Sequence, residues 1–175
     1  MKKVHYCLLW MAFGSFLYNF QSSTQAQEYS WSAVYSLIEN RFPQILTVDI
    51  STLETWLQST DVLIIDVRTR EEYLVSHLRG AQNQVAIEDF QNIPKDRRMV
   101  LYCSVGYRSA ELVQTLRKEG YTQVYNVKGS IFAWANAGKP VYRRGEKTTF
   151  VHPYNEVWGQ LLHKKYHPSL SNQER

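Results

Sequence analysis

The sequence predicts an α/β fold, in which helices cover both faces of a central, mostly parallel β-sheet. Two short and continuously apolar runs, residues 62–66 and 99–103, are typical of strands that are buried on both faces. A third strand is expected at residues 124–127. Helical segments separate these strands, and an alternation of strand and helix along the chain indicates a parallel sheet covered by helices.

The helical segments are recognised by their apolar faces and by residues that begin or end a helix. Ser51 or Thr52 is expected to cap the first helix, and Gly120 is expected to end the third. Four short helices are predicted between and beside the strands: residues 53–57, 70–76, 109–119 and 131–136.

Further elements are expected on both sides of this region. Residues 31–42 have apolar side chains at helical spacing and precede a proline, and residues 46–48 could form a short strand. Apolar residues at helical spacing after Pro153 predict a short amphipathic helix that packs on the domain. The expected organisation is an N-terminal helical extension at 27–50, one domain at 51–143 and a C-terminal tail at 144–175.

The first 26 residues are typical of a secretory signal peptide. Lys2 and Lys3 precede an apolar stretch, and small residues stand three positions before and directly before the expected cleavage site after Ala26. The predicted location is therefore the periplasm or the outside of the cell. The alternative is an uncleaved anchor, because residues 4–20 reach the lower length limit of a membrane span. Contact with a membrane is expected only in that case.

The charge of the chain does not indicate a nucleic-acid-binding protein. The 175 residues include 20 basic and 16 acidic side chains, a formal charge of +4. Loss of the two lysines in the first 26 residues would leave 18 basic against 16 acidic residues, or +2. The sequence also has no run of lysine and arginine of the kind that binds nucleic acid.

Removal of the signal peptide would leave one of the two cysteines, Cys103. A single thiol in an oxidising compartment cannot form an internal disulfide, and it is a candidate reactive group. It also excludes a Cys-x-x-Cys pair and a cysteine-rich zinc site. The alternative is an inert, buried cysteine. His163 and His167 have a metal-compatible spacing but no third ligand, so neither a metal nor another cofactor is expected.

The residues around Cys103 favour a reactive thiolate. Cys103 ends a buried strand and precedes a tight loop and a helix, the place where open α/β sheets bind ligands. Inward N–H groups of the loop, the helix N-terminus and the charge of Arg108 all favour the thiolate. Gly106 permits a tight turn, and Ser109 would cap the helix or donate into the loop. The candidate anion-binding loop consists of Ser104, Val105, Gly106, Tyr107, Arg108 and Ser109.

Several motifs in order resemble the rhodanese family over residues 51–141. They are Asp66-Val67-Arg68, Glu72-Tyr73, His77 to Asn83, Cys103 to Ser109, Gly120-Tyr121, Val127 to Ser130, Trp134 and Gly138 to Val141. The resemblance implies a rhodanese-like fold and the transfer of sulfane sulfur. Cys103 would take sulfur from a small anion such as thiosulfate and form a persulfide. The sulfur would then pass to a thiol or to cyanide, while Arg108 and the loop amides hold the donor.

The length of the loop separates two chemistries within this superfamily. Four residues separate Cys103 from Arg108 in a Cys-x4-Arg pattern, whereas the related phosphatases use a loop one residue longer that accommodates phosphate. A phosphatase or arsenate reductase is therefore the weaker alternative. The other alternative is a non-catalytic rhodanese-like module that carries sulfur or binds a protein partner.

Two departures from the family pattern leave the donor open. Ser104 stands where many members have a basic or larger residue, and Gly129-Ser130 replaces a pair of glycines. Asp66 and Arg68, at the end of a predicted strand, would either orient the loop or form a structural ion pair, and the structural role is favoured.

Overall fold

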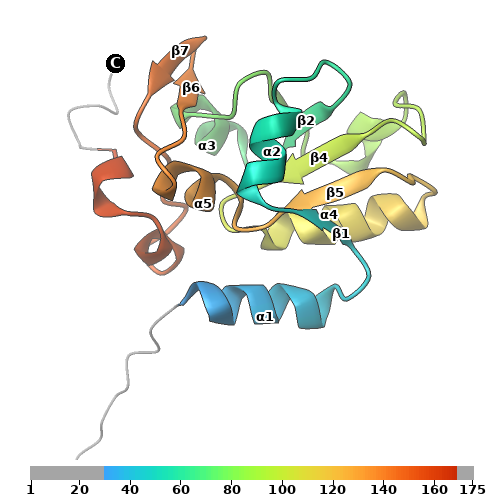
Figure 1. The fold of residues 1–175 in the computed structure, drawn as a ribbon, viewed down its shortest axis with the longest axis horizontal. Coiled ribbons are helices and arrows are strands. Elements are labelled where there is room, and N and C mark those ends of the chain that lie inside the picture. The colour runs from blue at the N-terminus through green and yellow to red at the C-terminus, as the bar shows by residue number, and fades with distance from the viewer. Residues whose placement is uncertain (1–29, 169–175) are drawn as a thin grey trace, which may run out of the picture.

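Five parallel strands form the central sheet in a computed structural model that describes residues 30–168 (Figure 1). The strands follow the order β1-β5-β4-β2-β3, and each neighbouring pair is parallel. Because β4 lies at the centre, the loop that follows it has a strand end on each side. The bounds are Leu46–Val48 for β1, Leu63–Asp66 for β2, Gln82–Asn83 for β3, Met99–Tyr102 for β4 and Val124–Val127 for β5.

Helices cover both faces of the sheet, which confirms the predicted fold class. Successive side chains of β4 point to opposite faces, so Val100 packs in one hydrophobic cluster and Leu101 in the other. The cluster around Val100 includes residues of α1, α2 and α5, whereas the cluster around Leu101 includes residues of α4. The helices are α1 (Trp31–Arg41), α2 (Ile50–Trp56), α3 (Arg70–Val75), α4 (Tyr107–Lys118) and α5 (Ser130–Asn136), with a 3₁₀ helix at Ile87–Phe90.

The starts of α2 and α3 show how local hydrogen bonds set the helix boundaries. The helix α2 begins earlier than predicted because Asp49, rather than Ser51 or Thr52, caps it, and Asp49 Oδ1 accepts from the Thr52 N–H at 2.7 Å. The helix α3 begins with a capping box. The Thr69 hydroxyl accepts from the Glu72 N–H at 3.3 Å, and Glu72 Oε2 accepts from the Thr69 N–H at 3.1 Å.

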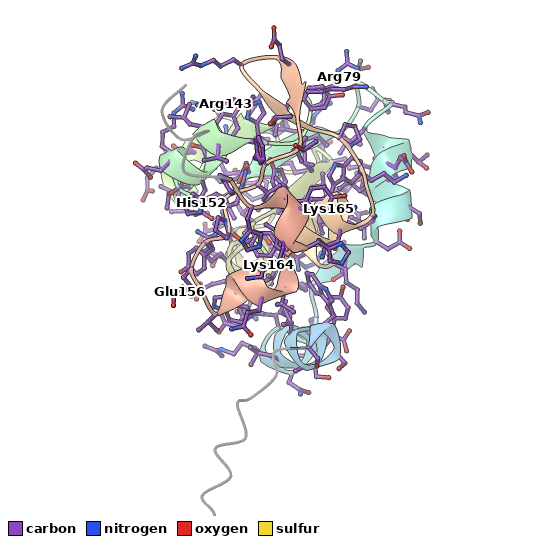
Figure 2. The ribbon with its side chains drawn as sticks, turned by 90° about the vertical axis from the view of Figure 1, so that its left-hand side faces the viewer. Arg79, Arg143, His152, Glu156, Lys164 and Lys165 are labelled. Atoms are coloured by element: carbon purple, nitrogen blue, oxygen red, sulfur yellow. The ribbon has the colours of Figure 1, made fainter. Side chains whose placement is uncertain are left out.

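The C-terminal tail folds back onto the domain. Strands β6 (Val141–Arg143) and β7 (Glu146–Thr148) form an antiparallel hairpin after α5 (Figure 1). Two short 3₁₀ helices, Trp158–Leu161 and Lys164–Tyr166, stand in place of the predicted amphipathic helix. Asn155 Oδ1 accepts from the Trp158 N–H at 2.9 Å, a local bond that favours a turn over a continuous α-helix. Figure 2 looks onto this side of the molecule, where Lys164 and Lys165 are labelled.

The tail packs tightly, as predicted from its apolar residues. Val151, Leu161 and Leu162 are buried in the same cluster as Val100. The predicted signal peptide lies outside the described residues, and the export that it implies stays a prediction. Among residues 30–168, no helix has the length and apolar character needed to cross a membrane.

Candidate functional site

Cys103 lies directly after β4, in the tight loop that leads into α4. The residue is buried, with 1% of its surface exposed, and the N–H of Gly106 donates to its Sγ at 3.1 Å. Gly106 has a φ of +112°, and a Cβ at this position would lie 3.3 Å from the carbonyl oxygen of Val127. Glycine is therefore needed for the turn that directs an amide at the sulfur, as the sequence predicts.

The opposite side of the loop is bound by the N-terminus of α5. The N–H groups of Ile131 and Phe132 donate to the carbonyl oxygens of Cys103 and Ser104, at 3.2 and 3.1 Å. The Ser130 hydroxyl accepts from the N–H of Cys103 at 3.1 Å. Because α5 binds these loop carbonyls, they are turned away from the sulfur.

The surroundings of Cys103 lower the pKa of its thiol. Burial raises this pKa, but the charge of Arg108 and interactions with Ser109 and Gly106 outweigh burial. Gly106 is the N-cap of α4, so Ser109 lies in the first turn of the helix rather than at its cap. The Ser109 hydroxyl is buried and makes no hydrogen bond of ordinary geometry, and its proximity to the sulfur favours the thiolate. These surroundings favour the thiolate of Cys103, the form in which a cysteine acts as a nucleophile.

Arg108 supplies the positive charge of the site, but both terminal nitrogens of its guanidinium, which form a fork of donors, bind Glu72. Arg108 Nη1 donates to Glu72 Oε2 and Arg108 Nη2 donates to Glu72 Oε1, both at 2.8 Å. The Ser104 hydroxyl donates to Glu72 Oε1 and accepts from Arg108 Nη2, both at 3.0 Å. The sequence predicted that this fork binds the sulfur donor. In the structure the fork is paired with a carboxylate that is 3% exposed and needs a cation because an unpaired buried charge is costly, and the role of Arg108 toward a donor stays a prediction.

Sequence reasoning did not place Glu72 in the site. The pKa of Glu72 is lowered to about 2, because the hydrogen bonds and charge of Arg108 outweigh the effect of burial. The spacing of Thr69 and Glu72 indicates a capping box, which places a carboxylate at the start of a helix. The partner of that carboxylate lies 36 residues further along the chain, and no local pattern identifies it.

The predicted supporting residues, Asp66 and Arg68, form an ion pair in the framework of the domain. Their side chains are fully buried and the Arg68 Nη2 to Asp66 Oδ2 distance is 2.7 Å. Arg68 Nη2 also donates to the carbonyl oxygen of Ser76 at 2.5 Å. Asn83 Nδ2 donates to the carbonyl oxygens of Asp66 and Arg68, at 3.0 and 2.8 Å. The pair thereby ties the end of β2 to α3 and β3, which supports the structural role.

A small pocket of about 90 Å³ opens onto Cys103, and the tail forms part of its wall. The Tyr154 ring centroid lies 4.5 Å from the Arg108 guanidinium carbon, a cation–π contact. Sequence analysis assigned the tail to packing alone and did not identify its two pocket residues. The pocket is lined by Cys103, Ser104, Val105, Tyr107, Arg108, Tyr154 and Trp158.

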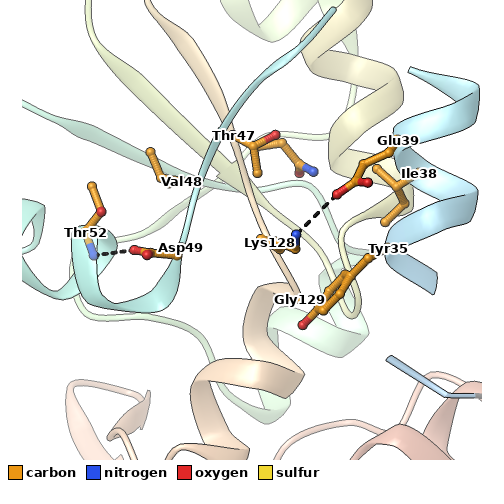
Figure 3. A pocket seen from close by; sticks show the side chains of 10 residues that line it. Tyr35, Ile38, Glu39, Thr47, Val48, Asp49, Thr52, Lys128 and Gly129 are labelled. Carbon is orange, nitrogen blue, oxygen red and sulfur yellow. Dashed lines mark hydrogen bonds and ion pairs between the residues drawn. The ribbon is translucent and has the colours of Figure 1, made fainter. Parts of the chain in front are cut away.

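A larger cavity of about 530 Å³ lies between α1 and the edge strand β1 (Figure 3). An ion pair spans part of it, with 3.2 Å between Lys128 Nζ and Glu39 Oε1. Asn126, which also lines this cavity, donates from Nδ2 to the carbonyl oxygen of Gly106 at 3.1 Å. The lining of this cavity contains no cysteine, whereas the smaller pocket contains the candidate nucleophile Cys103.

The described residues contain no group of three or more His, Cys, Asp and Glu side chains placed to hold a metal. His167 Nε2 lies 3.1 Å from the carbonyl oxygens of Gly159 and Leu162. The ring of His167 is thus within hydrogen-bond distance of backbone carbonyls of the tail.

Comparison with known proteins gives consistent matches over the domain. A family model described as Rhodanese-like domain matches residues 49–137, just over half of the chain. The "Sulfurtransferase" of Allochromatium vinosum is 36% identical over 99 residues, which cover 54% of this chain and 92% of that protein. The "Probable adenylyltransferase/sulfurtransferase MoeZ" of Mycobacterium tuberculosis is 37% identical over 100 residues, which cover 54% of this chain and only 26% of that longer protein.

A solved structure gives the same assignment. The solution structure of a rhodanese-like domain from Anabaena has a TM-score of 0.52 and 25% sequence identity, and the match covers 55% of this chain and 78% of that one. The region that the family model matches contains strands β2 to β5 of the sheet and the Cys103 loop, and the edge strand β1 precedes it. The chain belongs to the rhodanese-like domain family.

Proposed function

We propose that this protein is a sulfurtransferase that carries sulfane sulfur as a persulfide on Cys103. The proposal rests on one observation above all: a thiol of lowered pKa at the centre of the sheet, with the Gly106 N–H directed at its sulfur. A thiolate is the form of cysteine that acts as a nucleophile. Membership of the rhodanese-like family, and relatives named as sulfurtransferases, support the same reaction class.

The first half of the proposed reaction loads sulfur onto the enzyme. With thiosulfate as donor, the Cys103 thiolate attacks the outer sulfur atom. A new sulfur–sulfur bond forms on Cys103 while the donor's sulfur–sulfur bond breaks, and sulfite leaves with the bonding electron pair. The product is an anionic persulfide, and the Gly106 N–H and the Ser109 hydroxyl are placed near enough to stabilise negative charge on sulfur.

The second half returns the enzyme to its starting state. A thiophilic acceptor such as cyanide attacks the terminal sulfur of the persulfide. The bond between that sulfur and Cys103 breaks, and its electron pair stays on Cys103 as the regenerated thiolate. Cyanide becomes thiocyanate in this step, whereas a thiol acceptor would become a persulfide.

The ion pair between Arg108 and Glu72 changes how an anionic donor would be held. Glu72 is deprotonated at neutral pH, so it offsets much of the charge of Arg108. Ser104 adds no cation of its own. Recognition of an anionic donor therefore depends more on the loop amides and on the N-terminus of α4 than the sequence suggested.

The test is a two-step mass and product measurement on the full chain. Incubation with thiosulfate should add the mass of one sulfur atom to the peptide that contains Cys103, and later addition of cyanide should remove it with formation of thiocyanate. Cys103→Ser should show neither product. A folded protein that gains no sulfur from thiosulfate or from a low-mass persulfide contradicts the proposal. Sulfur uptake without release to cyanide or to a thiol would assign a sulfur carrier instead of an enzyme.

A further inference from the structure

The tail contributes Tyr154 and Trp158 to the pocket at Cys103, and both residues lie outside the region that the family model matches, residues 49–137. The pocket at the nucleophile is therefore built from two parts of the chain. The loop of the family domain supplies its base, and the tail supplies two aromatic side chains of its wall.

The tail is held in place by hydrogen bonds on both sides of these aromatic residues. The N–H of Val151 donates to the carbonyl oxygen of Tyr166 at 2.8 Å. Asn136 of α5 donates from Nδ2 to the carbonyl oxygen of Leu161 at 2.7 Å and accepts from the N–H of His163 at 2.8 Å. With the buried side chains described above, these bonds make the aromatic wall a fixed part of the fold.

The backbone at Tyr154 indicates that its position is specified rather than incidental. Tyr154 has a φ of +66°, in the left-handed region that is unfavourable for a residue with a Cβ. Its N–H donates to His152 Nδ1 at 3.0 Å, and its ring lies against the guanidinium of Arg108. These contacts keep the ring at the pocket although 43% of the residue surface is exposed.

The pocket that results is small. Its volume of about 90 Å³ is well below the roughly 300–1,000 Å³ of pockets that hold drug-sized ligands. Such a space accommodates a compound of a few heavy atoms around the sulfur. A tripeptide thiol, or a cysteine presented by another protein, would have to displace the aromatic rings.

We propose that Tyr154 and Trp158 are specificity-determining residues that restrict Cys103 to sulfur donors and acceptors of low mass. This inference rests on the proposed function for its substrates, but the size limit itself is a property of access to the thiol. Inorganic anions and small persulfides or thiols are the expected partners of Cys103, and glutathione-sized thiols are excluded.

The first experiment measures access to Cys103 without any sulfur transfer. The full chain is labelled with N-ethylmaleimide or with fluorescein-5-maleimide, which share one reactive group and differ in size. Modification of the peptide that contains Cys103 is followed by mass spectrometry, so that Cys7, the other cysteine of the sequence, does not contribute. We expect the bulky reagent to be disfavoured by about tenfold or more in the native protein, relative to the ratio of the two rates in denaturant.

Variants of the tail show whether the aromatic side chains cause this selectivity. The double variant Tyr154→Ala/Trp158→Ala should bring the ratio of rates close to the value in denaturant. Val157→Ala is the matched control, because Val157 is an exposed residue of the same segment that does not line the pocket. If circular dichroism shows that the double variant is unfolded, Tyr154→Ala alone replaces it, since Tyr154 is partly exposed. A folded variant with the wild-type ratio, or a wild type without selectivity, overturns the proposal.

The second experiment tests whether the same size limit applies to the acceptor in sulfur transfer. The wild type, loaded from thiosulfate, should pass sulfur to cyanide and not to glutathione, whereas the double variant should use both acceptors. If no variant transfers sulfur to any acceptor while the labelling still depends on reagent size, the proposed function fails and the size limit stands. If the wild type uses glutathione as readily as cyanide, the size limit fails and the proposed function stands.

Discussion

Arg108 and Glu72 form a bidentate ion pair beside the candidate nucleophile, with 2.8 Å between each nitrogen and its partner oxygen. The pair joins the first turn of α3 to the first turn of α4, and the Ser104 hydroxyl bonds to both members. A cation that favours the thiolate of Cys103 is thus held in place by a nearly fully buried anion. Substitutions at Arg108 and Glu72 can separate the effect of the ion pair on the reactivity of Cys103 from its effect on the stability of the fold.

Replacement of Arg108 should weaken catalysis. Arg108→Ala removes the charge that favours the thiolate, and kcat/KM with thiosulfate should fall by about ten- to a hundredfold, the scale of 1.5–3 kcal/mol for a hydrogen bond to a charged group. Arg108→Lys should recover only part of this loss, because an ammonium restores the charge without the planar pair of N–H donors that binds the two oxygens of Glu72 side by side. Steady-state kinetics measures the change in kcat/KM, with Cys103→Ser as the inactive control. Wild-type kcat/KM for Arg108→Ala would show that the cation has no role in the reaction.

The same pair should show strong coupling in stability. Arg108→Ala leaves the Glu72 carboxylate buried without its cation, and the free energy of unfolding should fall by about 2–3 kcal/mol. In the double variant Arg108→Ala/Glu72→Gln the stranded charge is absent, so the loss should be smaller than the sum of the two single losses. Urea unfolding of the four proteins gives the coupling directly. Additive losses would mean that the pair is only a surface contact.

Acid should destabilise the protein through Glu72. The pKa of Glu72 is about 2 in the folded protein against an ordinary value of 4.5, so the unfolded chain binds the proton at higher pH than the folded chain does. The stabilisation, about 3 kcal/mol, is present above pH 4.5 and is lost as the pH falls toward 2. In urea unfolding, the difference between wild type and Glu72→Gln should therefore shrink from pH 6 to pH 2.5. Glu111→Gln, an exposed carboxylate of α4, is the control, and it should show little change in stability over this range.

Ser109 should influence the thiol rather than the fold. Its hydroxyl is buried beside Cys103 without another hydrogen-bond partner, so Ser109→Ala should leave stability almost unchanged while raising the pKa of the Cys103 thiol. The pH dependence of Cys103 alkylation by iodoacetamide measures this effect. The midpoint should move to higher pH in the variant, and the rate at pH 6 should fall severalfold. An unchanged midpoint would show that the loop amides and Arg108 alone set the thiol's reactivity.

Ser130 should stabilise the loop through its hydroxyl despite an unfavourable backbone conformation. The hydroxyl is the acceptor for the N–H of Cys103, so Ser130→Ala leaves a buried donor unpaired and should cost about 1–3 kcal/mol. Ser130 has a φ of +51°, and glycine at this position relieves roughly 1 kcal/mol of strain. Ser130→Gly should therefore be less destabilised than Ser130→Ala in urea unfolding. The opposite order would show that strain at this residue is negligible.

The sequence predicted four of the five strands of the sheet and the tight turn after Cys103, because these depend on local patterns, whereas the two-residue strand β3 was not predicted. The apolar runs at 62–66 and 99–103 correspond to β2 and β4, and the turn after Cys103 needs the glycine found at position 106. The predicted start of α2 was wrong. Asp49, Ser51 and Thr52 are all good N-cap residues, and only the backbone conformation selects among them. The choice among such residues is made by the path of the chain that precedes the helix.

The parts of the site that were missed depend on contacts between distant segments. Glu72 has a local signal for its place in α3 but none for its pairing with Arg108. Tyr154 and Trp158 have apolar spacing that indicates packing, and the direction in which the tail crosses the domain decides that they meet the pocket. A sequence pattern with a period of one helical turn identifies a buried face, but it does not identify what that face covers.

The binding of the loop carbonyls by α5 separates the chemistry of sulfur from the choice of donor. The Gly106 N–H that turns toward Cys103 belongs to the main chain, whose polarity does not titrate and does not depend on the identity of the side chains around it. Exchanges at Val105 or Tyr107 would therefore alter the walls that a donor meets while the Gly106 N–H still faces the sulfur. Under the proposed function, such a fold can accept new sulfur compounds as substrates after small changes in the sequence of the pocket walls. Gly106 is the loop position at which glycine has to be retained.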